Sequence, residues 1–290
     1  MKIGKKFVPV ILVCVLAACL SLAQGQDKKT TEYLLSRSLT DSEAYIWYLH
    51  NSGWAIKTRN HFLIFDYIGT DAPSGNLSLS NGQINAKEIG AQRVIVFVTH
   101  QHQDHYSSQI FEWEKNVKQI AYVFGWPVER QGNYTVMNPR ESKTVNGAEI
   151  FTIKSTDLGV GFLVKVDGLT IFHAGDHALW HTLFKKAYED EINYIAAVAP
   201  MIDLAFVPVT TGFRANCKPS DSVTEGALYA IEVLKPKVAF PMHVICDGML
   251  HLYGEFAELA KKRPVGSNVL AAEASGIAFH YKAGIVNRVK

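Results

Sequence analysis

The feature that most constrains this chain is the sequence T-H-Q-H-Q-D-H at residues 99–105, which directly follows the apolar run V-I-V-F-V. A continuous apolar run of this length predicts a buried strand, so the polar segment begins where that strand ends. On the turn that follows, His100 and His102 can converge on one metal ion, while Asp104 and His105 face a second position. Imidazole and carboxylate groups are ligands that zinc takes at about 2.0 to 2.2 Å. The segment therefore predicts a metal site, against the simpler interpretation of a polar loop with solvated histidines.

Two later strand ends carry the further ligands that a pair of metal ions would need. The sequence H-A-G-D ends the apolar run at residues 169–172, and Gly175 permits a sharp exit that aims Asp176 off the sheet edge. His243 ends a later run in the same way, with the sequence P-M-H. Either motif alone is more often structural. Together with the segment 99–105 they supply a bridging carboxylate and another ligand for a second ion.

The rest of the chain alternates between strand and helix patterns. Short apolar runs separated by Gly, Asn and Asp predict strands, and D-G at residues 167–168 predicts a hairpin turn. Apolar residues at helical spacing predict helices. The predicted strands are residues 45–49, 54–57, 62–65, 94–98, a run near 120, 150–153, 162–166, 169–172, 205–209 and 238–241, with two weak strands closing the chain; the predicted helices are residues 107–117, 222–234 and 255–262. This order predicts one domain with two sheets packed face to face and helices outside.

In order and spacing, these motifs resemble the metallo-β-lactamase-fold hydrolases over nearly all of residues 24–290. Asp66 ends a predicted strand and matches the first motif of that family, residues 100–105 match the second, Asp176 the fourth and His243 the fifth. The resemblance implies an α+β protein, a four-layer αββα sandwich with its metal site along one edge of the β-sandwich.

The resemblance also implies a role for each polar side chain. The implied ligands are His100 and His102 on the first ion, Asp104, His105 and His243 on the second ion, and Asp176 as the bridge between the two ions. Asp66 is expected to hold the loop and orient the ligands without binding metal.

One family motif is missing from this chain. The third motif is a histidine on the first ion, and residues 106–172 contain no histidine; the corresponding strand exit reads S-T-D-L-G-V-G-F from Ser155. Three interpretations stay open. Asp157 replaces the imidazole, since zinc accepts a carboxylate oxygen at nearly the same distance. Alternatively His177 or His181, four residues apart, reaches the first ion. Finally, the first position is weak or empty, and a single ion lies on the other ligands.

The expected reaction is hydrolysis of a small-molecule substrate. Metal binding lowers the pKa of water from 15.7 toward about 7, and Asp104 is the expected catalytic residue that orients this water and transfers its proton. Zinc is expected, as one or two ions, with iron or manganese as alternatives. Esters, lactones and phosphodiesters are favoured, because lactams and thioesters are associated with an intact third motif. The alternatives are an iron-dependent oxidoreductase of the same fold and an inactive metal-containing binding module.

The substrate-binding residues are not identified by any motif. Aromatic residues that could line the mouth of the site, or simply belong to the core, are Tyr45, Trp47, Tyr48, Trp180 and Phe213. Arg214 could hold a carboxylate or phosphate, although a solvated loop arginine is the simpler interpretation.

Residues 1–23 have the features of a signal peptide: three lysines, an apolar stretch and a small-residue exit. The sequence L-A-A-C also resembles a bacterial lipobox, which would end the signal at residue 18 and anchor the protein through a lipid on Cys19; an uncleaved anchor is a further alternative. We therefore expect an exported protein, periplasmic or membrane-anchored, with residues 24–290 as the folded domain. Its oligomeric state, and whether Cys217 pairs with Cys246, are left open.

Loss of residues 1–23 removes three lysines and no acidic residue, so the formal charge moves from +2 to −1. A chain with this charge lacks the excess of positive charge that is typical of nucleic-acid-binding domains. A nucleic-acid partner is therefore not expected.

Overall fold

The computed structural model describes residues 28–69, 77–129, 132, 134–211, 217–246 and 248–289. Two units are distinguished, residues 1–37 and residues 38–290, and in the first unit residues 28–36 form a helix. The predicted signal peptide and Cys19 lie outside the described residues. Within the described part of the chain, no helix combines the length and the apolar character needed to span a bilayer.

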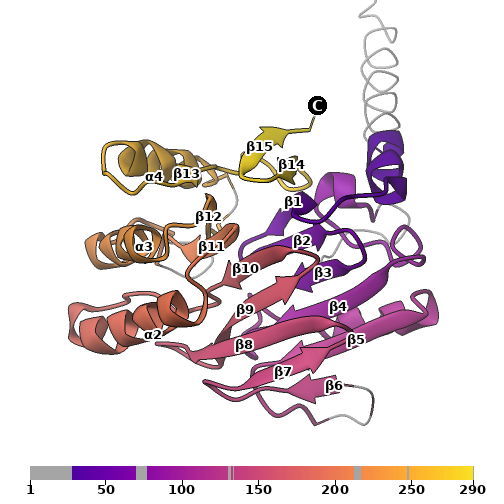
Figure 1. Ribbon diagram of the computed structural model, residues 1–290, viewed down its shortest axis with the longest axis horizontal. Coiled ribbons are helices and arrows are strands. Elements are labelled where there is room, and N and C mark those ends of the chain that lie inside the picture. Colours follow the sequence, from indigo (N-terminus) through magenta and orange to yellow (C-terminus); the bar gives the residue numbers. More distant parts are fainter. Residues whose placement is uncertain are drawn as a thin grey trace, which may run out of the picture. The chain divides into compact units, whose positions relative to one another are not determined.

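The first sheet of the larger unit contains eight strands in the order β15-β14-β1-β2-β3-β4-β5-β6 (Figure 1). β1 to β3 form the predicted antiparallel meander, whereas β3, β4, β5 and β6 run parallel to one another. The strands are β1 (Glu43–His50), β2 (Gly53–Lys57), β3 (Phe62–Phe65), β4 (Arg93–Val98), β5 (Gln119–Phe124), β6 (Tyr134–Val136), β14 (Ala278–Lys282) and β15 (Ile285–Arg288).

The second sheet contains seven strands in the order β13-β12-β11-β10-β9-β8-β7. Its antiparallel half includes the predicted hairpin, in which Asp167 and Gly168 have φ angles of 48° and 75°. Its other half, from β10 to β13, is parallel. The strands are β7 (Ser142–Val145), β8 (Ala148–Lys154), β9 (Val160–Val166), β10 (Leu169–His173), β11 (Leu204–Pro208), β12 (Val238–Met242) and β13 (Asn268–Val269).

Aromatic side chains join the two sheets into one core. The Trp54 ring lies 4.8 Å from that of Phe206, and the Phe97 ring lies 5.3 Å from that of Phe162. All four residues are buried. Burial of each such side chain stabilises the fold by about 1.5–3 kcal/mol, so the sheet-to-sheet interface contributes to the stability of the domain.

Helical segments cover the outer faces of both sheets. Helices α2 (Lys185–Val198), α3 (Asp221–Leu234) and α4 (His251–Lys261) lie along the second sheet (Figure 1). The 3-10 segment η3 (Ser108–Lys115) packs on the first sheet, where the Tyr122 hydroxyl donates to the Ile110 carbonyl. Two shorter 3-10 turns are η2 (Leu79–Asn81) and η4 (Thr182–Phe184). The predicted four-layer α+β sandwich is confirmed.

Two helical segments differ from the sequence prediction. The segment expected as a helix at residues 107–117 is 3-10, and the Tyr122 hydroxyl occupies a carbonyl that an α-helix would use internally. Helix α2 was not predicted, although Tyr188, Ile192 and Ile195 are buried at helical spacing. Its many charged residues obscured that pattern.

The fold brings several strand ends to one edge of the sandwich. β3 and β4 are parallel neighbours, so their carboxyl ends lie at the same edge of the first sheet. β10 and β12 both run parallel to β11, so their carboxyl ends lie at the same edge of the second sheet. The turn between β8 and β9 lies at the same edge, because a Cβ on Gly159 (φ 66°) would lie 2.0 Å from the Thr99 carbonyl. A Cβ on Gly175 (φ 56°) would lie 2.8 Å from the Thr99 Cβ. These glycines allow three loops to meet at Thr99.

Candidate metal centre

The first group of candidate ligands consists of His100, His102, Asp157 and Asp176, whose donor atoms all lie within 4.8 Å of one another. His100 Nε2 lies 3.0 Å from His102 Nδ1 and 3.4 Å from Asp176 Oδ2. His102 Nδ1 lies 3.7 Å from Asp157 Oδ2. Two imidazoles and two carboxylates thus surround one position, here called the first position.

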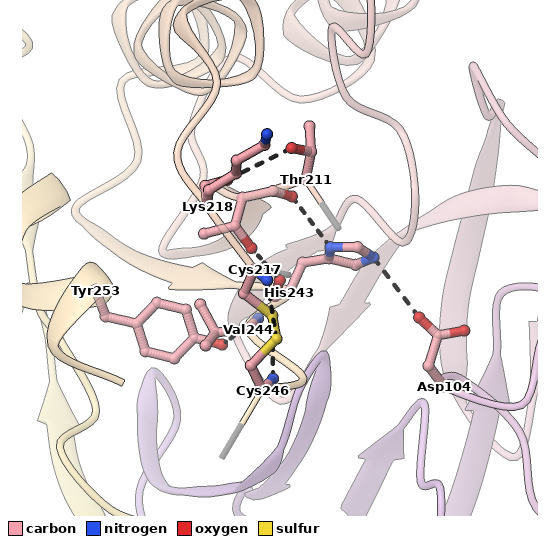
Figure 2. Close-up of a disulfide and its surroundings, with 9 residues drawn as sticks. Asp104, Thr211, Cys217, Lys218, His243, Val244, Cys246 and Tyr253 are labelled. Carbon is pink, nitrogen blue, oxygen red and sulfur yellow. Dashed lines mark hydrogen bonds and ion pairs between the residues drawn. A yellow bond between two sulfur atoms is a disulfide. The ribbon is translucent and has the colours of Figure 1, made fainter. Parts of the chain in front are cut away.

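The second group consists of Asp104, His105 and His243, also within 4.8 Å, and all three side chains are buried. Asp104 Oδ2 lies 3.7 Å from His105 Nε2 and 3.8 Å from His243 Nε2. Figure 2 shows the His243 ring directed at the Asp104 carboxylate. We call the point that these atoms face the second position.

Asp176 lies between the two positions. Its Oδ1 is 2.9 Å from His105 Nε2 and 3.3 Å from His243 Nε2, whereas its Oδ2 faces His100. One oxygen is therefore directed at each position, the arrangement that a bridging carboxylate requires.

Two buried atoms at this junction indicate that a cation belongs there. Asp176 Oδ1 and His105 Nε2 are buried and face each other at 2.9 Å, but neither makes a hydrogen bond of acceptable geometry among the described residues. Buried polar atoms are rarely left without a partner, and an imidazole nitrogen and a carboxylate oxygen are both metal donors. The side chains at this edge fit a divalent metal ion.

Asp66 lies behind the second position and hydrogen-bonds to the candidate ligand His105. Its Oδ2 accepts from His105 Nδ1 at 2.7 Å, and its two oxygens accept from the Thr99 amide and hydroxyl, each at 2.8 Å. Burial raises the pKa of Asp66, but the neighbouring His105, His173 and His100 rings outweigh it and hold the pKa below the ordinary value. The ionised carboxylate fixes the His105 tautomer that leaves Nε2 free to bind metal.

The imidazole groups differ in their titration. Burial and the charge of His105 lower the pKa of His100 to about 4, so His100 is neutral at physiological pH. Burial also opposes protonation of His105, but Asp176 and Asp66 raise its pKa well above the ordinary value. His105 therefore holds a proton more strongly than His100, and metal binding must displace that proton.

The three interpretations of the missing third motif have different outcomes. The structure places Asp157 in the first group, on the turn between β8 and β9. The route through His177 or His181 is wrong. The His177 ring stacks on Tyr188 and its Nε2 lies 3.2 Å from the Tyr188 carbonyl, while His181 caps η4 through its Nδ1. The question of a weak first position stays a prediction.

Sequence reasoning missed Asn51, which lies in the turn between β1 and β2. Its Nδ2 donates to the Asp104 carbonyl at 2.8 Å, and its own carbonyl accepts from the His243 amide at 3.3 Å and from the Tyr253 hydroxyl at 3.1 Å. Asn51 thus holds two second-position ligands together. No motif marks it, because its partners lie 53, 192 and 202 residues away in the sequence.

A cavity of about 860 Å³ opens onto the metal positions. It is lined by the ligand side chains His102, Asp104, Asp157, Asp176 and His243 together with Gln101, Gln103, Thr156, Trp180 and Phe184. Of the aromatic residues suggested for the mouth, Trp180 is at the cavity, whereas Tyr45, Trp47 and Tyr48 are buried in the core. Phe213 and Arg214 lie outside the described residues.

Comparison with known proteins identifies relatives of this chain. Residues 45–243 match the β-lactamase superfamily domain. A UPF0173 metal-dependent hydrolase of Bacillus velezensis is 29% identical over 211 residues, which cover 65% of this chain and 79% of the relative. The UPF0173 metal-dependent hydrolase YtkL of Bacillus subtilis is 28% identical over 217 residues, which cover 68% of this chain and 84% of the relative.

Solved structures share the fold at lower sequence identity. Igni18, a metallo hydrolase from Ignicoccus hospitalis, superposes with a TM-score of 0.57 at 16% identity, covering 86% of this chain and 99% of its own. CmlA, a diiron β-hydroxylase from Streptomyces venezuelae, has a TM-score of 0.53 at 11% identity, covering 87% of this chain and 55% of its own. These likenesses concern the fold.

Proposed function

The chain belongs to the β-lactamase superfamily and is a metal-dependent hydrolase, and on this premise we propose that it uses zinc to hydrolyse an ester or lactone with an apolar substituent. One observation carries the proposal. Asp176 directs one oxygen at each of two histidine-lined positions, and its buried Oδ1 faces His105 Nε2 at 2.9 Å without a hydrogen bond of acceptable geometry. Nitrogen and oxygen donors in this number suit zinc.

Asp104 is the proposed proton acceptor. When bound, a divalent ion supplies Lewis acidity, lowering the pKa of water toward about 7 and polarising the scissile carbonyl. The Asp104 carboxylate faces both the cavity and the histidines of the second position, and its backbone is fixed by Asn51. Its Oδ2 can therefore orient an attacking water and take its proton, while Asp176, His105 and His243 hold their positions.

The cavity wall supports an apolar substituent beside the scissile bond. The Trp180 indole donates from Nε1 to the Asp176 carbonyl and lies 5.3 Å from the His243 ring, so its face is fixed next to the second position. Phe184 lies on the same wall and is 48% exposed. An apolar group that covers these rings would be removed from water, at roughly 25 cal/mol per Å².

The proposal is tested by reconstitution. Protein stripped of metal is reloaded with zinc, manganese or iron and assayed on p-nitrophenyl esters of increasing acyl length, on lactones and on bis(p-nitrophenyl) phosphate. We expect zinc-loaded protein to hydrolyse esters or lactones, with KM falling as the acyl group lengthens. Trp180→Ala should remove this length dependence, and Asp104→Asn should lower kcat about 100- to 10,000-fold. If zinc-loaded protein binds a substrate but leaves all three classes intact, the hydrolase proposal fails and a binding module replaces it.

A second candidate is an iron-dependent oxidoreductase. The first position offers two imidazoles and one terminal carboxylate, His100, His102 and Asp157, a set that also suits non-haem iron. A diiron hydroxylase shares the fold. Stoichiometric iron in protein purified without added metal, together with oxygen consumption, would favour this candidate over hydrolysis.

We also propose that the protein is exported. The disulfide between Cys217 and Cys246 supports an oxidising compartment, because cytosolic thiols are kept reduced. Mass spectrometry of the mature protein tests this: an N-terminus at residue 24 indicates a soluble periplasmic form, and a lipid-modified Cys19 indicates a membrane-anchored form. An intact N-terminus on protein recovered from the cytosol would contradict export.

A further inference from the structure

A disulfide lies directly behind the second position. Cys217 and Cys246 are joined with a Cα–Cα separation of 5.8 Å, and Cys246 is three residues beyond His243 (Figure 2). Both cysteines are buried. The bond therefore links the segment that carries a candidate ligand to the loop that follows β11.

Hydrogen bonds connect the same two segments on either side of the disulfide. The Cys217 amide donates to Cys246 Sγ at 2.9 Å, and the Cys246 amide donates to Cys217 Sγ at 3.1 Å. At the other end, His243 Nδ1 donates to the Thr210 carbonyl at 3.2 Å, and the Thr210 hydroxyl donates to the His243 carbonyl. The segments 210–217 and 243–246 are thus joined at one end by the disulfide and at the other by the hydrogen bonds between Thr210 and His243, which together close a ring.

This ring sets the orientation of the His243 imidazole. Because the Thr210 carbonyl accepts a hydrogen bond from Nδ1, Nε2 is left to face Asp104 and Asp176. His243 has a φ angle of 75°, a conformation that a residue with a side chain adopts only where its surroundings impose it. The Val244 amide, bonded to the Tyr253 hydroxyl, and the disulfide are the constraints that follow it in the chain.

We propose that the Cys217–Cys246 disulfide is a positioning element for the second metal position, so that breaking it weakens metal binding by His243 while the first position is spared. The inference rests on the proposed metal site. His100, His102 and Asp157 belong to the β4 exit and the turn between β8 and β9, and among the described residues no hydrogen bond or ion pair joins the disulfide to either loop.

The test compares Cys217→Ala/Cys246→Ala with the oxidised wild type, each also in a His102→Ala background that isolates the second position. Zinc affinity is measured by competition with a chromophoric chelator, and ligand geometry by the absorption spectrum of bound Co²⁺. We expect the double variant to lose about 10- to 100-fold in second-position affinity, as is typical when a group that orients a ligand is removed. The Co²⁺ spectrum of that position should change as well, which a general loss of stability would not cause.

Asp203→Asn is the matched control. Asp203 is buried, and its carboxylate accepts from Lys237, Tyr281 and the Thr170 amide at the amino end of β11, away from the metal positions. This variant should lower thermal stability and leave both zinc affinities unchanged.

If the double variant does not fold, the wild type provides the second measurement. A phosphine reductant transfers two electrons to the disulfide and becomes a phosphine oxide with oxygen from water, and the sulfurs take up two protons to form two thiols. Iodoacetamide then blocks the thiols so that they cannot bind zinc. Zinc release from the second position supports the inference, and unchanged affinity in either experiment overturns it. Oxidised wild type that binds no metal would instead refute the proposed function.

Discussion

The two metal positions differ in how far the protein encloses them. At the second position, Asp104, His105 and His243 are all buried. At the first position His100 is buried, but the His102 and Asp157 side chains are 44% and 41% exposed. A buried ligand cannot turn away into water when metal is absent, so the second position is more fully preorganised than the first.

The supporting hydrogen bonds differ in the same way. His105 is held by Asp66, His243 by Thr210, and the Asp104 backbone by Asn51. At the first position, His100 donates to the Thr99 hydroxyl, whereas the His102 side chain has hydrogen-bond or ion-pair contacts only with other candidate ligands among the described residues. The difference predicts a tightly held ion at the second position and an exchangeable ion at the first.

Removing one histidine from each position gives the largest expected contrast. His105→Ala should lower the affinity for the tight ion by more than about 100-fold, since even residues that only orient a ligand contribute 10- to 100-fold. His102→Ala should leave the tight ion in place and remove only the weak one. Metal content after dialysis, measured by mass spectrometry, gives the stoichiometry. Equal losses in the two variants would show that the positions do not differ as inferred.

Asp66→Asn tests whether the hydrogen bonds create the difference. The amide is the same size but no longer fixes the His105 tautomer, so tight-ion affinity should fall about 10- to 100-fold. The Thr99 hydroxyl links Asp66 to His100, so a smaller effect at the first position is also expected. Chelator competition measures both. A loss confined to the first position would contradict our account.

The placement of the candidate ligands could be predicted from the sequence. Each candidate ligand follows an apolar run, and parallel strand ends meet at one edge, so the positions of His100, Asp176 and His243 relative to the strands were predictable. The fold class followed from the same alternation of strand and helix patterns.

The supports of the second position were not predictable. Asn51 acts through backbone carbonyl and amide groups that come together only in the assembled sandwich. The pairing of Cys217 with Cys246 depends on two loops that follow neighbouring parallel strands, β11 and β12. Side-chain exposure, which distinguishes His102 from His105, has no local sequence signal because it depends on what the other loops cover.

Asp157 should determine the metal preference of the first position. Asp157→His restores an imidazole and should raise zinc affinity there about tenfold, equivalent to 1.4 kcal/mol, while Asp157→Asn should lower it. Neither change should affect the second position, since Asp157 belongs only to the first group. Calorimetric zinc titration resolves the two ions. If Asp157→Asn leaves the weak ion unchanged, the carboxylate is not a ligand.

The smallest expected effect on metal binding comes from the opposite end of the sandwich. Asp167 lies in the turn that precedes β10, whereas the metal side chains follow β10 at its other end. It accepts hydrogen bonds from Thr58, Asn60 and His61. Burial raises its pKa, but these hydrogen bonds outweigh burial and lower the pKa to about 2.

Asp167→Asn should therefore lower the free energy of unfolding by about 1–2 kcal/mol at pH 7 without changing either zinc affinity. Because the folded pKa is depressed, the contribution of Asp167 is complete above its unfolded pKa of about 3.9 and is lost as the pH falls through about 2. Urea unfolding at pH 7 and pH 3 should show the difference between wild type and variant shrinking. Asp41→Asn, which removes an exposed ion pair with Arg59 nearby, is the control and should have little effect. A change in zinc affinity in Asp167→Asn would mean that the contacts that hold the second-position ligands depend on the opposite end of the sandwich.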